Sequence, residues 1–168
     1  MTAAPTDIRI RPATPADTAL ILALIRELAE YEKLAHEAVA DEAGLAAQLF
    51  GPTPRAEVLI VEVEGKPAGF ALFFHNFSTF VGKPGLYLED LFVRPAFRGR
   101  GLGKRLMVRL AQIAVERDCG RFEWSVLDWN TPAIDFYRSL GAVGMDDWTV
   151  QRVSGVALRA LAASGSTG

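Results

Sequence analysis

The period of the apolar positions changes several times along the chain. Residues 8–11 alternate isoleucine with arginine, which is the two-residue period of a strand. Thr14, Pro15 and Asp17 then supply the cap, the first-turn proline and the capping-box acid of a helix. That helix carries apolar residues at helical spacing, at Ile21, Leu24, Ile25 and Leu28. A second short helix is predicted over 41–50, ahead of a Gly-Pro pair.

The rest of the chain alternates strands with helices. Strands are predicted over 58–61, 68–74 and 86–93, the first two joined as a hairpin by Glu64-Gly65-Lys66-Pro67. The later predictions are a helix over 101–116, a strand over 122–127, a helix over 131–140 and at least one strand within 142–153. This order favours one mixed α/β domain over residues 1–168, with a core of about 8–153 and a frayed tail at 162–168.

The composition is that of a chain that buries a core. Of its 168 residues, 50% are apolar and 23% are charged, which excludes disordered, collagen-like and disulfide-rich classes. The formal net charge of −2 provides no strong field for nucleic acid or an anionic membrane, so we expect neither as a partner. The single cysteine, Cys119, allows no intrachain disulfide and no multi-cysteine metal site, and we expect no metal. The first residues lack the apolar region of a secretory signal, so we expect a cytoplasmic protein.

A glycine-rich turn between a predicted strand and a predicted helix is the most informative motif. The strand LYLEDLFV at 86–93 continues into RPAFRGRGLG at 94–103, and the helix begins inside this turn. Backbone N–H groups at a helix N-terminus lack intrahelical acceptors, and glycines let phosphate oxygens approach them closely. The turn therefore predicts a pyrophosphate site, to which Arg98, Arg100 and Lys104 add positive charge.

The spacing within the turn separates three phosphate-binding patterns. A P-loop requires Ser or Thr after Gly-Lys, whereas Arg105 follows Gly103-Lys104, and the glycines are wrongly spaced for G-x-G-x-x-G. The pattern that fits is R-x-x-G-x-G, at Arg98, Gly101 and Gly103. The alternative is an ordinary glycine turn with solvated arginines.

With this motif, the chain resembles the GNAT superfamily of N-acetyltransferases over roughly 8–153, and within it the diamine and thialysine acetyltransferase branch. Other blocks that match in the same order are IRPAT at 10–14, ELAEYEKL at 27–34, VLDWN at 126–130 and DFYRSLGA at 135–142. Polyamine-acetylating members carry Asp and Trp where this chain has Ser78 and Phe80, a difference that argues against spermidine-type substrates.

The resemblance implies a fold, a co-substrate and a set of residues. The implied fold is a single GNAT-type domain with a central mixed, mostly antiparallel sheet flanked by helices. Acetyl-CoA is the implied co-substrate, a small amine the implied substrate, and a homodimer the implied assembly. The Val93 N–H would polarise the thioester carbonyl, and Asn130 would hydrogen-bond the pantetheine arm unless it only caps a helix. The implied cofactor-binding residues are Leu91, Phe92, Val93, Arg98, Gly99, Arg100, Gly101, Leu102, Gly103, Lys104, Asn130 and Tyr137.

Acetyl transfer to an amine requires a base, because an alkyl ammonium has a pKa near ~10.4 and no free lone pair. Glu89 is the candidate, at the position of the family's base-side glutamate; the alternative is a surface acid or an ion-pair partner. Strand alternation is expected to place Glu89 on one face with Tyr87 and Leu91, and Asp90 on the other face with Leu88.

The departing thiolate requires a proton, and Tyr137 is the candidate general acid. Its context FYRSLGA matches the family's proton-donor tyrosine; the alternative is a core tyrosine with a satisfied hydroxyl. Cys119 is the only thiol, and neither histidine is near it in sequence, so we expect direct transfer in a ternary complex rather than a covalent enzyme.

Acidic residues gather at 27–42, which holds six acids and one lysine, whereas 94–109 holds six basic residues and no acid. The acidic stretch is either a solvated helix face or the mouth of a site for a cationic amine. Members of the branch use a glutamate that matches Glu32 in the amine pocket, so the candidate substrate-binding residues are Glu32, Glu89 and Asp90. Two other functions stay open at this point: a non-catalytic acetyl-CoA sensor and a protein N-acetyltransferase.

Overall fold

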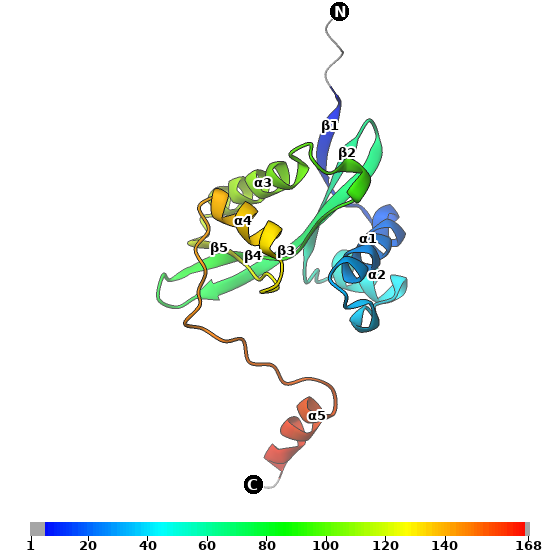
Figure 1. Cartoon of the computed structure of the whole chain (residues 1–168). Coiled ribbons are helices and arrows are strands. Elements are labelled where there is room, and N and C mark those ends of the chain that lie inside the picture. The colour runs from blue at the N-terminus through cyan, green and yellow to red at the C-terminus, as the bar shows by residue number, and fades with distance from the viewer. Residues whose placement is uncertain (1–5, 167–168) are drawn as a thin grey trace, which may run out of the picture. The chain divides into compact units, whose positions relative to one another are not determined.

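The computed structural model describes residues 6–166 (Figure 1). A first compact unit ends at Ser125 and a second begins at Val126. The elements in chain order are β1 (Ile8–Pro12), α1 (Thr18–Tyr31), α2 (Glu42–Phe50), β2 (Glu57–Val63), β3 (Lys66–Ser78), β4 (Lys83–Val93), α3 (Leu102–Glu116), β5 (Arg121–Trp124), α4 (Thr131–Ser139) and α5 (Gly155–Ala163).

The first unit is built on a five-stranded sheet in the order β1-β2-β3-β4-β5. The pairs β1·β2, β2·β3 and β3·β4 are antiparallel, and β4·β5 is parallel. The parallel connection runs through α3, as a crossover between parallel strands requires. The predicted mixed, mostly antiparallel sheet flanked by helices is therefore confirmed.

Helices cover both faces of this sheet. On one face, α1 and α2 pack on a core of buried side chains from the three middle strands: Ile21, Leu24, Leu28, Leu49, Val58, Ile60, Phe70, Leu72 and Phe92. On the other face lies α3 (Figure 1), whose buried side chains are Leu102, Leu106, Met107, Leu110, Ile113 and Ala114. A sheet that is buried on both faces explains the nearly continuous apolar runs of β2 and β3.

The predicted role of Asp17 as the capping-box acid at the start of the first helix is confirmed. The backbone N–H of Thr14 donates to the Asp17 carboxylate over 2.7 Å, and a short 3₁₀ turn at Pro15–Asp17 leads into α1. Arg11 also donates two hydrogen bonds to this carboxylate, from its two terminal nitrogens to the two oxygens, over 2.8 and 3.0 Å. This fork of charge-assisted bonds lowers the pKa of Asp17 to about 2. The start of α1 is thereby tied to the end of β1.

A β-bulge interrupts β4 at Glu89. Leu72 of β3 pairs with Asp90, and the next residue, Phe73, pairs with Leu88, so Glu89 is the extra residue. Paired residues share a sheet face, and Leu72 and Phe73 face opposite ways. Leu88 and Asp90 therefore lie on opposite faces, and the prediction that they share one is wrong. The two-residue alternation fails there because the bulge adds one residue to the count.

The second unit departs from prediction more than the first does. Helix α4 is confirmed, and its cap Asn130 accepts a hydrogen bond from the Ala133 N–H over 3.4 Å. No described residue in 142–153 lies in a strand, so the predicted final strand is wrong, and α5 at Gly155–Ala163 was not predicted. Glycine and paired aspartates weaken the strand tendency of 142–153, while GVALRALAA is rich in helix formers.

Residues 162–166 of the predicted frayed tail are helical, and 167–168 lie outside the described residues. The single domain over 1–168 stays a prediction. Among the described residues, none of the helices has the length and apolar character needed to cross a bilayer.

Candidate active site

The glycine-rich turn has the backbone of an anion site. A 3₁₀ turn at Pro95–Phe97 leads from β4 into it, and Gly99 and Gly101 take positive φ angles of 76° and 72°. These left-handed conformations are strained for any side chain with a Cβ atom, which explains both glycines. A Cβ at either position would meet no described atom within 4 Å, so the space above the turn is open.

The N-terminus of α3 directs free backbone donors to this turn. Gly101 is the N-cap, and the first helical hydrogen bond runs from the Arg105 N–H to the Gly101 carbonyl over 3.0 Å. The N–H groups of Leu102, Gly103 and Lys104 precede that bond and have no acceptor one turn earlier in the helix. Together with the helix dipole and exposed basic side chains, they can hold a pyrophosphate. The side chains in question are Arg98, Arg100 and Lys104.

The end of β4 presents backbone donors on the side away from β3. Arg94 donates its backbone N–H to Ala68 of β3 over 2.8 Å, so alternation turns the N–H groups of Val93 and Leu91 away from β3. The Val93 carbonyl does point that way, since it accepts a bond from Arg98 Nε over 3.0 Å. On this side β5 pairs with β4 only as far as Leu88, within the described part of the chain. A thioester carbonyl could therefore reach the N–H of Val93, whereas Phe92 bonds toward β3.

Three carboxylates gather where β4 carries its bulge. Burial raises the pKa of Asp90 to about 7, and the negative charges of Glu89 and Glu32 add to the rise. Burial also raises the pKa of Glu32, which caps the C-terminus of α1. Glu89 is exposed. The structure thus brings together the three predicted substrate-binding residues, although Glu32 and Asp90 lie far apart in the sequence.

This cluster favours an organic cation on electrostatic grounds. Like charges in partly desolvated surroundings repel, and a bound ammonium replaces that repulsion by attraction. Among the described residues, no group of three or more His, Cys, Asp or Glu side chains is arranged to hold a metal ion.

Asn130 and Tyr137 belong to the second unit. Asn130 uses its side-chain oxygen as the cap of α4, as the alternative interpretation of this residue expected. Tyr137 lies in the last turn of α4 with its ring centroid 5.4 Å from that of Phe136, and Gly141 follows in a left-handed conformation. The roles of both residues toward the co-substrate stay predictions.

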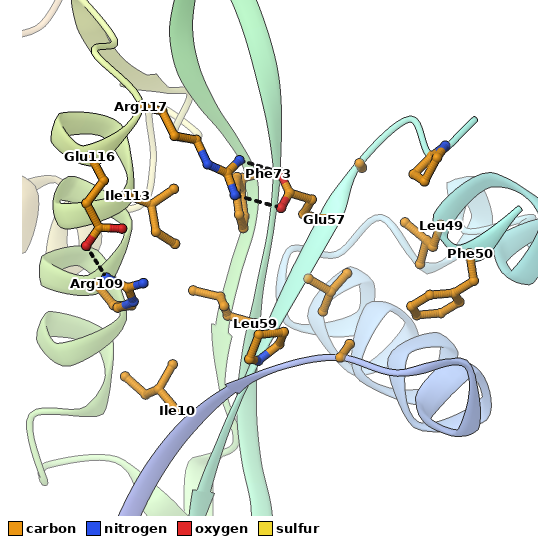
Figure 2. A pocket seen from close by; sticks show the side chains of 15 residues that line it. Ile10, Leu49, Phe50, Glu57, Leu59, Phe73, Arg109, Ile113, Glu116 and Arg117 are labelled. Atoms are coloured by element: carbon orange, nitrogen blue, oxygen red, sulfur yellow. Dashed lines mark hydrogen bonds and ion pairs between the residues drawn. The ribbon is translucent and has the colours of Figure 1, made fainter. Parts of the chain in front are cut away.

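A separate pocket of about 480 Å³ lies at the β1–β2 edge of the first unit (Figure 2). Its walls are mainly apolar, and its charged residues are already paired: Glu57 with Arg117, at 2.6 and 2.9 Å, and Glu116 with Arg109, at 2.9 Å. None of the predicted site residues lines this pocket. Its position and paired charges set it apart from the carboxylate cluster and the glycine-rich turn.

Comparison with known proteins decides the family. The model of the acetyltransferase (GNAT) family matches residues 21–142, a range that contains the carboxylate cluster, the glycine-rich turn and α4. The chain belongs to this GNAT family. The resemblance predicted from R-x-x-G-x-G and its companion blocks is thereby confirmed.

Curated relatives place this GNAT chain more narrowly. The thialysine N-epsilon-acetyltransferase of Bos taurus is 38% identical over 166 residues, covering 92% of this chain and 97% of the relative. The L-ornithine N5-acetyltransferase of Arabidopsis thaliana is 35% identical over 198 residues, covering 91% of this chain and 87% of the relative. The predicted likeness to the thialysine branch agrees with these names.

Solved structures confirm the fold. An integron cassette protein from the mobile metagenome of V. cholerae superposes with a TM-score of 0.78 at 30% identity, covering 92% of this chain and 97% of that one. An aminoglycoside N-acetyltransferase solved in complex with CoA gives a TM-score of 0.72 at 17% identity, covering 93% of this chain and 99% of that one. At that identity the second likeness concerns the fold alone.

Two features of the site were missed from the sequence. The bulge at Glu89 has no residue signature of its own in LYLEDLFV. The available signal was the pair of adjacent acids, because a regular strand that is buried on both faces would bury one of the two charges. The contacts of Glu27 and Tyr31 on α1 with the arginines of the glycine-rich turn were also missed. Their four-residue spacing places both on one helix face and was the available signal.

Proposed function

We propose that this protein transfers the acetyl group of acetyl-CoA to a primary amine of a small aliphatic substrate of the thialysine, ornithine or diamine type. The observation that carries the proposal is the carboxylate cluster, in which Glu89 and Glu32 lie close enough to Asp90 to raise its pKa. This cluster sits on the strand that runs into the glycine-rich turn. Membership of the GNAT family and the names of the relatives support acetyl transfer to an amine.

The chain's own residues have distinct tasks in this reaction. Glu32 and Asp90 attract the ammonium form of the substrate. Glu89, exposed beside them, takes the proton of the reacting ammonium directly or through a water molecule. The N–H groups at 102–104 and the side chains of the turn hold the pyrophosphate, and the Val93 N–H stabilises negative charge on the carbonyl oxygen.

Acetyl-CoA supplies an activated acyl group as a thioester. The amine nitrogen forms its bond to the carbonyl carbon as the carbon–sulfur bond breaks, and Tyr137 gives its phenolic proton to the departing thiolate. Direct transfer of this kind needs no protein nucleophile, which agrees with a chain whose only cysteine is Cys119.

The decisive experiment is an assay of thiol release from acetyl-CoA with thialysine, lysine, ornithine, putrescine, spermidine and a lysine-containing peptide. We expect thialysine, ornithine or putrescine to accelerate release most. Glu89→Gln should lower kcat by about 100-fold, within the usual range for a general base. Glu116→Gln is the matched control, because it neutralises an exposed acid on α3 and should leave the rate unchanged. If acetyl-CoA binds but no amine accelerates release, the protein is a sensor instead.

We propose a cytoplasmic homodimer as the assembly. Apolar side chains of the second unit that are exposed in a single chain support association: Val143, Met145, Trp148 and Val150. A single cysteine suits a reducing compartment. Light scattering on the purified chain tests the assembly, and a monomer at micromolar concentration would contradict it.

A further inference from the structure

The last two turns of α1 contact the connection between β4 and α3 at two points. At the first, Arg94 binds Glu27 as a fork, with Nε 3.0 Å from one carboxylate oxygen and Nη2 2.8 Å from the other. Its remaining nitrogen, Nη1, donates to the Pro67 carbonyl over 3.1 Å. Arg94 is therefore held by three hydrogen bonds to two partners just where β4 ends, in a geometry that is specific to a guanidinium.

The second contact lies one helical turn further on. The guanidinium carbon of Arg98 is 4.9 Å from the ring centroid of Tyr31 and 5.7 Å from that of Phe92. The same side chain donates from Nε to the Val93 carbonyl. Arg98, the first residue of R-x-x-G-x-G, thus joins α1 to the carbonyl of Val93 while its side chain stays exposed at the glycine-rich turn.

This arrangement ties the amine side of the site to its co-substrate side. Glu27 and Tyr31 are four residues apart on one face of α1, and Glu32 follows Tyr31 directly as the C-cap. The backbone N–H of Glu32 donates to the Leu28 carbonyl over 2.9 Å, so the Glu32 carboxylate moves with the last turn of α1. The Tyr31 ring and the last turn of α1 thus connect Arg98 to a member of the carboxylate cluster.

We propose that Tyr31 and Arg98 form a positioning pair that couples acetyl-CoA binding at the glycine-rich turn to amine binding at Glu32 and Asp90. The inference rests on the proposed function, since it presumes a co-substrate at the turn and an amine at the cluster. Neither residue of the pair needs to touch the reacting atoms. Ordering of Arg98 by a ligand at the turn holds the Tyr31 ring and the end of α1 in the geometry that binds the amine, so each ligand raises the affinity for the other.

The coupling is measured by calorimetric titration of an amine into the protein, with and without saturating CoA. The amine is the one that the thiol-release assay identifies as the best substrate, which we expect to be thialysine. CoA lacks the acetyl group and permits no turnover. We expect CoA to tighten amine binding by about fivefold in the wild type, within the usual range of coupling between sites, and the amine to tighten CoA binding by the same factor. Tyr31→Leu should reduce both factors to about one, whereas Tyr31→Phe, which keeps the ring face, should retain them.

Two controls separate positioning from a merely structural role. Tyr31 is 41% exposed, so Tyr31→Leu should fold with a Tm close to that of the wild type. Phe77→Leu removes an exposed aromatic ring on β3 and should leave the coupling intact. If an amine is acetylated but Tyr31→Leu keeps the wild-type coupling factor, or the wild type shows none, the positioning pair is refuted and the proposed function stands. If the wild type neither binds nor acetylates an amine, the proposed function fails and the coupling with it.

Discussion

Replacing Asp90 by asparagine is expected to stabilise the protein increasingly as the pH rises from 4 to 8. The wild-type carboxyl is partly buried near Glu89 and Glu32, and its pKa is raised from an ordinary 3.8 to about 7. A carboxyl with a raised pKa in the folded state costs no stability below its unfolded pKa, where both states hold the proton. Between pH 4 and pH 7 the unfolded chain ionises more readily than the folded one, so folding stability is progressively lost.

The magnitude follows from the size of that rise. From 3.8 to about 7, at about 1.4 kcal/mol per pH unit, the full cost of ionising Asp90 in the folded state is about 4 kcal/mol. Solvent near the exposed Glu89 screens part of it, so we expect Asp90→Asn to gain about 2–4 kcal/mol at pH 8 and less than about 1 kcal/mol at pH 4. The same variant should bind amines more weakly, because the cluster loses a negative charge: stability and function oppose each other at this residue.

Denaturant unfolding of both proteins at one-unit steps from pH 4 to pH 8 measures the difference directly. Asp135→Asn, an exposed acid on α4, is the matched control and should show no comparable trend. A variant that is no more stable than the wild type at pH 8, or a gain that is the same at every pH, would refute the assignment of a buried, charge-coupled carboxyl to Asp90.

Three further predictions concern the turn, the general acid and the start of α1. Gly101→Ala should lose about 1 kcal/mol of stability, because alanine is strained at a φ of 72°, and should raise the KM for acetyl-CoA at least tenfold. The matched control is Gly65→Ala, at a φ of 73° in the β2–β3 hairpin and with equally open surroundings. It should lose the same stability without a change in KM. Equal KM values for the two variants would remove the turn from co-substrate binding. Tyr137→Phe should lower kcat by about 100-fold without changing the Tm, as expected for loss of a general acid, and a wild-type kcat would dismiss that role. Asp17→Asn should cost about 1–3 kcal/mol at pH 7, because it breaks the fork with Arg11, and the cost should fade as the pH drops from 4 toward 2, where the wild-type carboxyl takes up its proton. A cost that persists at pH 2 in urea unfolding would assign the loss to packing instead.

The elements of the first unit were largely predictable because each carries a local signal. The hairpin turn at Glu64 to Pro67, the cap acid Asp17 and the helical spacing of α3 act over a few residues, and the structure has them where the sequence indicates. The position of the glycine-rich turn was predictable for the same reason: Gly99 and Gly101 are required by the backbone angles of the turn itself.

The features that local sequence patterns could not predict depend on partners far along the chain. The proximity of Glu32 to Asp90 joins the end of α1 to β4, and no local pattern specifies it; the family resemblance alone predicted it. The bulge at Glu89 is defined by the register with β3, which cannot be counted from one strand. The strand expected within 142–153 rested on a few apolar residues, and a weak strand tendency without a pairing partner is not sufficient to form one.

The bulge resolves a conflict that a regular strand could not. β4 runs through a sheet covered by α1 and α2 on one face and by α3 on the other, and it carries two adjacent carboxylates, Glu89 and Asp90. In an unbroken strand, neighbours point to opposite faces, so one of the two would enter the apolar packing under α3 at a cost of several kcal/mol for an unpaired charge. The extra residue leaves Glu89 exposed, keeps Leu88 in the core with Phe73, and turns Asp90 to the face from which Glu32 approaches. One irregular residue in the register thus lets a single strand carry core side chains together with the two acids that we propose for the amine site.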